Sequence, residues 1–291
     1  MTILVTGGTG QLALALEAAA NGLAVRRVGR PAFDFDRPET IQEAFDAHGP
    51  ALVINAGAYT AVDKAETDRD AAWRANAEGP GRLAALCAAA GVTLIHISTD
   101  YVFDGNKGAP YLESDPTTAL GVYGASKLAG EQAVLEANSR TTVLRTSWLV
   151  SQTGNNFVRT MINAGRKTDR LRVVADQRGC PTSAADLATA ILRVARGMLE
   201  GWDDSYGGIF HAAGSGETTW HGLAEAVFEE AERHGLRRPT VTAITSAEWP
   251  TPVRRPPDSR LDCAKLEATF GITLPHWRGS LRRIVDLIFA G

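Results

Sequence analysis

The chain has 291 residues, of which 44% are hydrophobic and 22% are charged, and its formal net charge is -3. This is the composition of an ordinary globular protein, and the length allows about two domains. The lack of a basic excess argues against a nucleic-acid-binding protein. No apolar run is long enough for a membrane span, and the N-terminus does not have the pattern of a signal peptide. Three scattered cysteines fit reduced thiols, so we expect a location in the cytoplasm.

Short apolar strands alternate with helices through the first half of the chain. The expected strands are 2–6, 24–28, 51–55, 93–98 and 142–146, and the expected helices are 11–20, 38–47, 69–90 and 122–137. Strands that are apolar on both faces and alternate with helices indicate βαβ units and a parallel sheet covered on both sides. The sequence therefore predicts an α/β fold, a doubly wound parallel sheet of the Rossmann type.

The regular alternation of strands and helices changes after Trp148. Expected helices are 154–169, 183–199, one from 217 onward and 281–289, expected strands are 171–175 and 208–212, and the proline-rich stretch 250–257 is expected to be a loop. We therefore expect two interleaved domains. Residues 1–150 form the dinucleotide-binding domain, whose sheet is completed by parts of 170–215, and residues 151–291 form most of a smaller substrate domain.

A glycine loop follows the first predicted strand directly and opens the first predicted helix. Its spacing is Gly7-x-x-Gly10-x-x-Ala13, with alanine at the position of the third small residue. Glycines there let the backbone turn sharply and approach a pyrophosphate, and the helix N-terminus offers unpaired N–H groups to the phosphates. The loop therefore predicts a bound dinucleotide.

The second strand ends with arginines and has no acid. Enzymes selective for NAD usually place a carboxylate there to bond the ribose 2′-hydroxyl. This chain has Arg27 and Arg30 instead, and a guanidinium suits a 2′-phosphate. We therefore expect NADPH as the cofactor, with NADH as the open alternative. Asp34 and Phe35 are expected near the adenine.

A tyrosine and a lysine four residues apart open the helix at 122–137. Tyr123 and Lys127 share one helix face. A free phenol has a pKa of about 10, and a neighbouring ammonium together with the oxidised nicotinamide would lower that pKa toward neutrality. Thr99, at the end of a strand, can donate a hydrogen bond to the same substrate oxygen. These residues predict a proton-transfer site.

Together these motifs resemble the extended short-chain dehydrogenase/reductases, and six further strings resemble the dTDP-4-dehydrorhamnose reductase family within them. The resemblance covers essentially the whole chain. The strings are 60–66 (TAVDKAE), 98–103 (STDYVF), 145–148 (RTSW), 154–157 (GNNF), 218–221 (TTWH) and 255–261 (RPPDSRL).

The resemblance implies the reduction of the C4 ketone of dTDP-4-dehydro-L-rhamnose to dTDP-L-rhamnose, the last step in the synthesis of this dTDP-sugar. Tyr123 would protonate the alkoxide, Lys127 would hold the nicotinamide ribose and tune Tyr123, and Thr99 would polarise the ketone. The residues expected to bind the cofactor are Gly7, Thr9, Gly10, Gln11, Leu12, Arg30, Asp34, Phe35, Ala56, Gly57, Ala58, Tyr59, Ser98, Tyr123 and Lys127.

The same resemblance implies a sugar pocket lined by Thr99, Asp100 and Trp148, and we expect Arg260 to contact the diphosphate. Two alternatives stay open. Asp100 beside the threonine leaves room for another nucleotide-sugar enzyme, an epimerase or a dehydratase, and the fold also occurs in non-catalytic NADP-binding regulatory subunits. We expect no metal site and no nucleic-acid or membrane partner, and a homodimer is possible.

Overall fold

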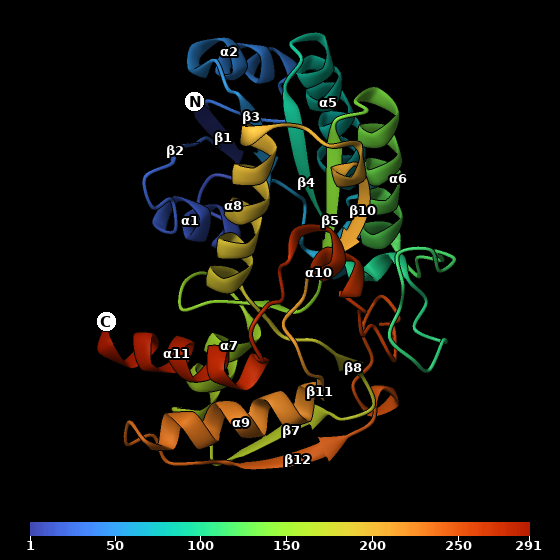
Figure 1. Ribbon diagram of the computed structural model, residues 1–291. Coiled ribbons are helices and arrows are strands. Elements are labelled where there is room, and N and C mark those ends of the chain that lie inside the picture. The colour runs from blue at the N-terminus through green and yellow to red at the C-terminus, as the bar shows by residue number, and fades with distance from the viewer.

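A six-stranded parallel sheet forms the centre of the computed structural model, which describes residues 1–291 (Figure 1). Its strands are β1 (Thr2–Thr6), β2 (Ala24–Arg27), β3 (Leu52–Asn55), β4 (Thr93–Thr99), β5 (Thr141–Thr146) and β10 (Gly208–His211). Their order in the sheet is β10-β5-β4-β3-β1-β2, which confirms the predicted doubly wound α/β fold. The direction of winding reverses between β1 and β3, so a crevice opens at the carboxyl ends of these strands.

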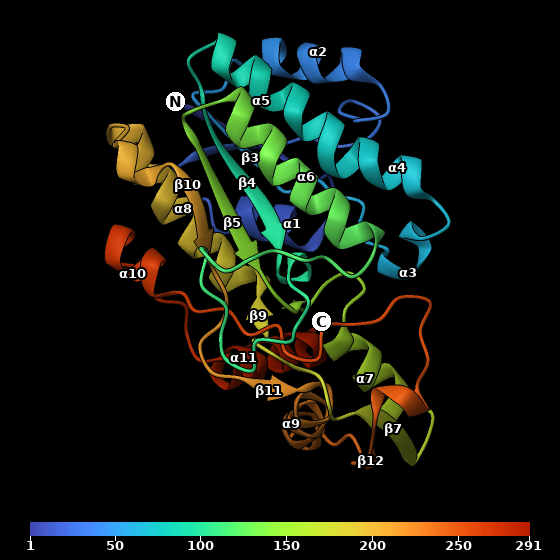
Figure 2. The ribbon, with the colours of Figure 1, turned by 90° about the vertical axis from the view of Figure 1, so that its right-hand side faces the viewer.

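Helices cover both faces of the sheet, as Figure 2 shows. One face carries α1 (Gln11–Ala18) and α8 (Ala184–Glu200), and the other carries α2 (Pro38–His48), α5 (Gly79–Ala89) and α6 (Val122–Ala137). The buried residues of β1 serve both faces: Ile3 packs in the cluster with α1 and α8, and Leu4 packs in the cluster with α2 and α5. This two-sided burial explains why the strand sequences are continuously apolar.

The rest of the chain forms a smaller layer below the carboxyl ends of the strands (Figure 1). It contains α7 (Phe157–Gly165), β7 (Arg170–Val174), α9 (Trp220–Glu232), β12 (Thr240–Ile244) and α11 (Trp277–Ala290). These helices share a separate apolar core around Val158, Phe228 and Leu281. The short strands β6 (Leu149–Val150), β8 (Arg178–Gly179), β9 (Thr182–Ser183) and β11 (Thr218–Thr219) connect this layer to the sheet, and α10 (Ala264–Phe270) packs near β10.

Two details differ from the sequence-based expectation. From the segment 170–215, β10 and α8 join the sheet domain, but β7 pairs with β12, a strand that we did not predict. The helix expected at 69–90 is divided into α4 (Arg69–Trp73), a π-helical turn (Arg74–Glu78) and α5. The remaining short helix is α3 (Val62–Ala65). None of the helices combines the length and the apolarity needed to cross a bilayer.

Candidate active site

A cleft of about 870 Å³ lies along the carboxyl ends of the central strands, within the size range of small-molecule sites. Its wall is formed by the residues that follow β1, β2, β3, β4 and β5, together with the segment 154–155, which contacts Gln11 at the start of α1. Thr99, Asp100 and Trp148 of the expected sugar pocket line it. Of the expected cofactor residues, the cleft is lined by Gly7, Thr9, Gly10, Gln11, Leu12, Arg30, Asp34, Phe35, Ala56, Gly57, Ala58, Ser98 and Tyr123.

The glycine loop presses against both neighbouring strands. Gly7 (φ +110°) and Gly8 (φ +54°) adopt left-handed backbone conformations that favour glycine. A Cβ on Gly7 would lie 2.9 Å from the Ala56 carbonyl oxygen, and a Cβ on Gly29 would lie 2.3 Å from the Gly8 Cα. No side chain caps the N-terminus of α1 at Gly10. The loop and this helix end therefore fit the pyrophosphate of a dinucleotide.

The two arginines after β2 have different surroundings. Arg27 donates a 2.7 Å hydrogen bond to the Gly8 carbonyl oxygen and pairs with Glu17 at 3.0 Å. The Arg30 side chain is 76% exposed, and its Nε is 3.9 Å from the nearest carboxylate oxygen, that of Asp34. Arg27 thus supports the glycine loop, whereas Arg30 is available to a 2′-phosphate at the rim of the cleft.

A buried chain of polar groups runs behind the cleft wall. Thr6 Oγ1 donates to Asn55 Oδ1 at 2.6 Å, and this oxygen also accepts the Gly57 N–H at 3.2 Å. The Asn55 amide nitrogen donates to His96 Nδ1 at 3.0 Å, and His96 Nε2 lies 3.3 Å from Lys127 Nζ. Burial, with the charge of Lys127, holds the pKa of His96 well below its ordinary value. His96 is therefore neutral, and it connects Asn55, behind the cleft wall, to Lys127.

Lys127 lies behind the cleft wall, outside the set of lining residues, although it shares the α6 face with Tyr123. Its side chain is buried, and Nζ donates a 2.6 Å hydrogen bond to the Ile97 carbonyl oxygen. Burial lowers the pKa of Lys127 to about 8, and the nearby carboxylate of Glu131 opposes this effect. Glu131 is itself held by Arg145, in an ion pair of 2.6 Å.

The Tyr123 phenol is more weakly acidic than expected. Burial raises the pKa of Tyr123 to about 12, the charge of Asp100 adds to this, and a hydrogen bond with Thr99 opposes it. We expected Lys127 to lower the pKa of Tyr123. In the protein alone it does not, because Nζ faces Ile97 and His96. At neutral pH the phenol therefore keeps its proton and can act as a donor.

Thr99 and Asp100 face the cleft at the end of β4. Thr99 Oγ1 donates to Asp100 Oδ1 at 3.1 Å and accepts the Tyr101 N–H at 3.2 Å. Asp100 is 1% exposed, burial raises its pKa to about 6, and its Oδ2 has no hydrogen-bond partner within the protein. The pair offers a hydroxyl and an unsatisfied carboxyl oxygen to a polar ligand.

Trp148 forms a flat aromatic wall in the cleft. Its ring stacks on Trp220 with the centroids 3.5 Å apart and an angle of 5° between the planes. Its backbone has φ +45°, a conformation that non-glycine residues rarely adopt. A Cβ on Gly179 would lie 2.3 Å from the Trp148 ring, so the ring is fixed from both sides. Such strain at a cleft residue is typical of functional positions.

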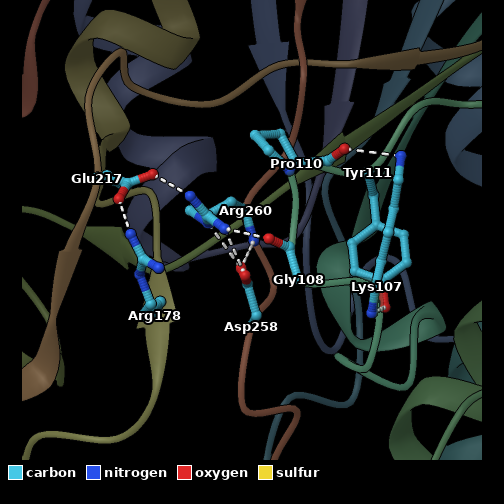
Figure 3. Close-up of polar contacts among 8 residues, drawn as sticks. All are labelled: Lys107, Gly108, Pro110, Tyr111, Arg178, Glu217, Asp258 and Arg260. Carbon is cyan, nitrogen blue, oxygen red and sulfur yellow. Dashed lines mark hydrogen bonds and ion pairs between the residues drawn. The ribbon is translucent and has the colours of Figure 1, made fainter.

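Arg260 does not line the cleft, although we expected it to contact the diphosphate. Figure 3 shows its guanidinium between Asp258 and Glu217 instead. Its Nε and Nη2 donate to the two carboxylate oxygens of Asp258 at 2.8 and 2.6 Å, and Nη1 donates to Glu217 at 2.5 Å. Glu217 also pairs with Arg178, and Arg260 Nη2 contacts the Gly108 carbonyl oxygen. These carboxylates raise the pKa of Arg260, and its guanidinium links three loops of the protein.

Tyr59 also lies outside the cleft lining. Its hydroxyl donates to Asp68 at 3.1 Å, and its backbone N–H donates to Asn76 Oδ1 at 2.8 Å. Other lining residues were not among the expected site residues. Several of them lie within the strings 60–66, 145–148 and 154–157: Thr60, Val62, Thr146, Ser147, Gly154 and Asn155.

Comparison with known proteins gives one consistent result. The RmlD substrate binding domain family matches residues 1–289. A dTDP-4-dehydrorhamnose reductase of Sinorhizobium fredii is 48% identical over 286 residues, covering 98% of this chain and 97% of that protein. The crystal structure of a dTDP-4-dehydrorhamnose reductase of Clostridium acetobutylicum matches with a TM-score of 0.92 and 38% identity over 99% of both chains.

A second solved structure is the dTDP-4-dehydrorhamnose reductase of Bacillus anthracis in complex with NADP. It matches with a TM-score of 0.90 and 32% identity over 98% of both chains. The matches extend over both the sheet domain and the smaller layer, as the resemblance of the sequence strings predicted. The chain therefore belongs to the RmlD substrate binding domain family, that of the dTDP-4-dehydrorhamnose reductases.

Proposed function

We propose that the chain catalyses the NADPH-dependent reduction of the C4 ketone of dTDP-4-dehydro-L-rhamnose, which gives dTDP-L-rhamnose. The observation that carries the proposal is that Thr99 and Tyr123 meet in the wall of the cleft that begins at the glycine loop. The names of the relatives and the NADP complex of the Bacillus anthracis protein support the same reaction and cofactor.

The residues along the cleft fit the parts of NADPH in order. The pyrophosphate would lie on the glycine loop and the N-terminus of α1, which no side chain caps. Arg30 would meet the 2′-phosphate, and Asp34 with Phe35 would border the adenine. Gly57 and its neighbours follow β3 where the cofactor would pass. When bound, NADPH supplies the hydride.

Tyr123 is the proton donor in this proposal. The carbonyl oxygen of the substrate gains negative charge as C4 accepts the hydride, and the neutral phenol then gives its proton to that oxygen. Thr99 would donate a hydrogen bond to the same oxygen after releasing Asp100. Lys127 Nζ contacts the Ile97 carbonyl oxygen and His96 in the protein alone, and its assignment to the nicotinamide ribose and to tuning Tyr123 stays a prediction.

Asp100 is the specific feature that favours a second candidate, a dehydratase or an epimerase of a nucleotide sugar. A carboxyl group with a pKa of about 6 can exchange protons near neutral pH. In the reductase, the same buried carboxyl group would bond a hydroxyl of the sugar instead.

The experiment is a turnover assay with enzymatically generated dTDP-4-dehydrorhamnose, following NADPH consumption and the product sugar. The proposal expects one NADPH oxidised for each dTDP-rhamnose formed, with the C4 deuterium of labelled NADPH recovered in the product. Conversion without net NADPH consumption would indicate an epimerase or a dehydratase. NADPH binding with no conversion would indicate a regulatory subunit.

The proposal also includes a homodimer and a location in the cytoplasm. The three unpaired cysteines fit a reducing compartment. Light scattering on the purified protein would measure the assembly, and fractionation of the source cells would measure the location.

A further inference from the structure

His96 is a fully buried histidine to which the proposed reaction gives no role. It lies on β4, opposite Asn55 of β3 in the sheet register. Its Nδ1 is 3.0 Å from the Asn55 amide nitrogen, and its Nε2 is 3.3 Å from Lys127 Nζ. Each ring nitrogen thus faces another nitrogen, while a neutral imidazole carries one N–H proton. The position of that proton determines what Lys127 meets.

The orientation of the Asn55 amide is fixed by two donors. Its Oδ1 accepts the Thr6 hydroxyl at 2.6 Å and the Gly57 N–H at 3.2 Å. In the reversed orientation the amide nitrogen would face the Gly57 N–H, and the Thr6 hydroxyl would lose this acceptor. The amide nitrogen therefore points to His96 and donates to Nδ1. Since Nδ1 accepts this bond, the ring proton is assigned to Nε2.

The Nε2–H of His96 points at the side-chain nitrogen of Lys127. Lys127 Nζ already donates to the Ile97 carbonyl oxygen at 2.6 Å. An ammonium group has no lone pair, so two donors would face each other at His96. A neutral amine accepts the Nε2–H through its lone pair while one of its own N–H bonds still reaches Ile97. Each contact along the chain from Thr6 to Lys127 therefore joins a donor to an acceptor when Lys127 is an amine.

Glu131 opposes this assignment, because its carboxylate, one turn later on α6, favours the ammonium form of Lys127. Arg145 of β5 binds that carboxylate through Nε and Nη2, at 2.9 and 2.6 Å, and Ser98 of β4 donates to it as well. The ion pair reduces the field of Glu131 at Lys127. Burial outweighs the carboxylate and lowers the pKa of Lys127 to about 8.

The other ionisable groups on the elements around α6 contribute less to the pKa of Lys127. Tyr123, one turn earlier, keeps its proton at neutral pH, and Asp100 at the end of β4 bonds to Thr99. Glu66 of α3 accepts the first N–H of the helix. The remaining elements carry their charges outward: Arg69 and Asp70 of α4, Arg74 and Glu78 of the π-helical turn and Arg82 of α5 are exposed.

We infer that His96 is a positioning residue whose Nε2–H, oriented by Asn55, holds Lys127 as a neutral amine in the protein without cofactor. The chain of contacts starts at the Gly57 N–H, in the wall of the cleft. The state of Lys127 is thus connected to the cofactor wall through a single imidazole. Only the effect of this connection on turnover rests on the proposed function.

The test is nuclear magnetic resonance of the full chain without cofactor, labelled with ¹⁵N in histidine and ¹³C in lysine. His96→Phe identifies the His96 signals by their disappearance. In the wild type we expect a neutral ring protonated on Nε2, and a Lys127 ¹³Cε signal that titrates near pH 8. A ring protonated on Nδ1 would overturn the inference, and this wild-type spectrum needs no variant that folds.

Asn55→Asp reverses the arrangement. A carboxylate accepts a hydrogen bond from Nδ1–H, so the ring proton should move to Nδ1 and leave Nε2 as an acceptor for the ammonium. The titration of Lys127 should then rise by about one pH unit or more. Asn138→Asp is the matched control, because Asn138 is a buried asparagine that donates to the Val92 carbonyl oxygen and not to His96. It should leave both signals unchanged.

A Lys127 titration that stays in place when the His96 proton moves would also overturn the inference. In turnover, the pH dependence of kcat should shift in the same direction as the Lys127 titration in Asn55→Asp. The spectra need no substrate. A failed reductase assay beside an Nε2-protonated His96 would therefore reject the proposed reaction and keep the role of His96.

Discussion

Burial shifts the pKa values of three ionisable groups at the catalytic end of the cleft, and each shift favours the neutral form of the group. Asp100 rises to about 6, Lys127 falls to about 8 and Tyr123 rises to about 12. A site of low polarity strengthens each hydrogen bond made to a charge that develops during the reaction. The same burial destabilises the folded protein wherever a group must stay charged.

Replacing the proposed proton donor gives the most direct prediction at this scale. Tyr123→Phe keeps the ring packed against Tyr101 but removes the phenolic proton. We expect kcat to fall by a factor of about 10² to 10⁴, the usual contribution of a positioned acid, with NADPH affinity unchanged. Steady-state kinetics and a cofactor titration measure the two quantities. Substantial residual activity would mean that another group donates the proton.

Asp100 gives a prediction about stability and pH. Its pKa is about 6 in the folded protein against 3.8 ordinarily, so between these values the folded state binds more protons than the unfolded state and stability falls as pH rises. Above pH 6 the carboxylate therefore costs up to about 3 kcal/mol. Asp100→Asn should raise the free energy of unfolding at pH 7.5, and the gain should disappear near pH 4.

Urea unfolding of both proteins at the two pH values measures this difference. Asp104→Asn is the control, because Asp104 accepts hydrogen bonds from Asn106 and Tyr111 that lower its pKa. That substitution should destabilise the protein at neutral pH. A gain for Asp100→Asn that is equal at both pH values would exclude titration as its cause.

Arg30 gives the prediction about cofactor choice. Its guanidinium is exposed and only loosely paired, so its removal should affect NADPH and spare NADH. Arg30→Ala should raise the Kd of NADPH about tenfold, the loss expected for a charge-assisted contact. Fluorescence titration of both cofactors measures the ratio. An unchanged ratio would remove Arg30 from the cofactor site.

Single residues show what the sequence could and could not predict. The glycine loop, Thr99 and Tyr123 were identified because the spacing itself encodes a backbone turn or a shared helix face. Arg260 and Lys127 are expected to bind ligands because they are cations, but a sequence does not reveal which carboxylates or carbonyls hold them in the folded protein. Arg255 begins the string 255–261, but its contacts with Tyr101 and Asp63, which are far away in the chain, are not visible in the sequence.

At the scale of elements, α6 is placed by unusually close backbone contacts. A Cβ on Gly124 would lie 2.2 Å from the Tyr101 carbonyl oxygen, and one on Gly130 would lie 1.9 Å from the Asn76 carbonyl oxygen. Asn76 lies in the π-helical turn and donates to Ser126 on α6 at 3.0 Å. The irregular turn thus fixes the position of α6, the helix that carries the proposed proton donor Tyr123.

Two glycine substitutions test this close contact between α6 and the π-helical turn. Gly130→Ala should destabilise the protein by about 1–3 kcal/mol, because the new methyl group overlaps backbone that cannot move away easily. Gly197→Ala in α8 is the matched control, since its Cβ would meet nothing within 4 Å. There alanine should stabilise the protein by up to about 1 kcal/mol through helix propensity. Thermal unfolding compares the two, and equal effects would contradict the close contact.

The elements that the sequence failed to predict share a physical cause. The segment 170–174 has the apolar character of a strand, but its partner β12 lies some seventy residues later and is largely exposed. Strand pairing of this kind depends on long-range contacts and not on local pattern. The sheet strands were predictable because burial on both faces leaves a continuous apolar signature.

At the scale of the molecule, two separate cores meet around the cleft. Gln11, the first residue of α1, accepts hydrogen bonds from Ser151 at 3.0 Å and from Asn156 at 2.9 Å across this boundary. Asp186 of α8 makes a second connection, to Arg283 of α11 at 2.8 Å. A ligand lying between the cores should stabilise both of them.

Cofactor linkage tests this arrangement. NADPH at about 100 times its Kd should raise the free energy of unfolding by about 2.7 kcal/mol, if only the folded state binds it. Both cores should then unfold in one shifted transition, measured by calorimetry with and without NADPH. If the smaller layer unfolded in a separate transition whose temperature did not change with NADPH, the two parts would unfold independently.

The stacked pair of Trp148 and Trp220 gives the cleft a built-in optical signal. Two indoles stacked at 3.5 Å couple their electronic transitions, which produces a circular dichroism band whose sign and size depend on the angle between the two transition dipoles. A sugar in contact with Trp148 would alter that band without any label or coupled reaction. Trp220→Phe should abolish the band while leaving the Trp148 face of the cleft in place, so substrate entry could be followed separately from hydride transfer.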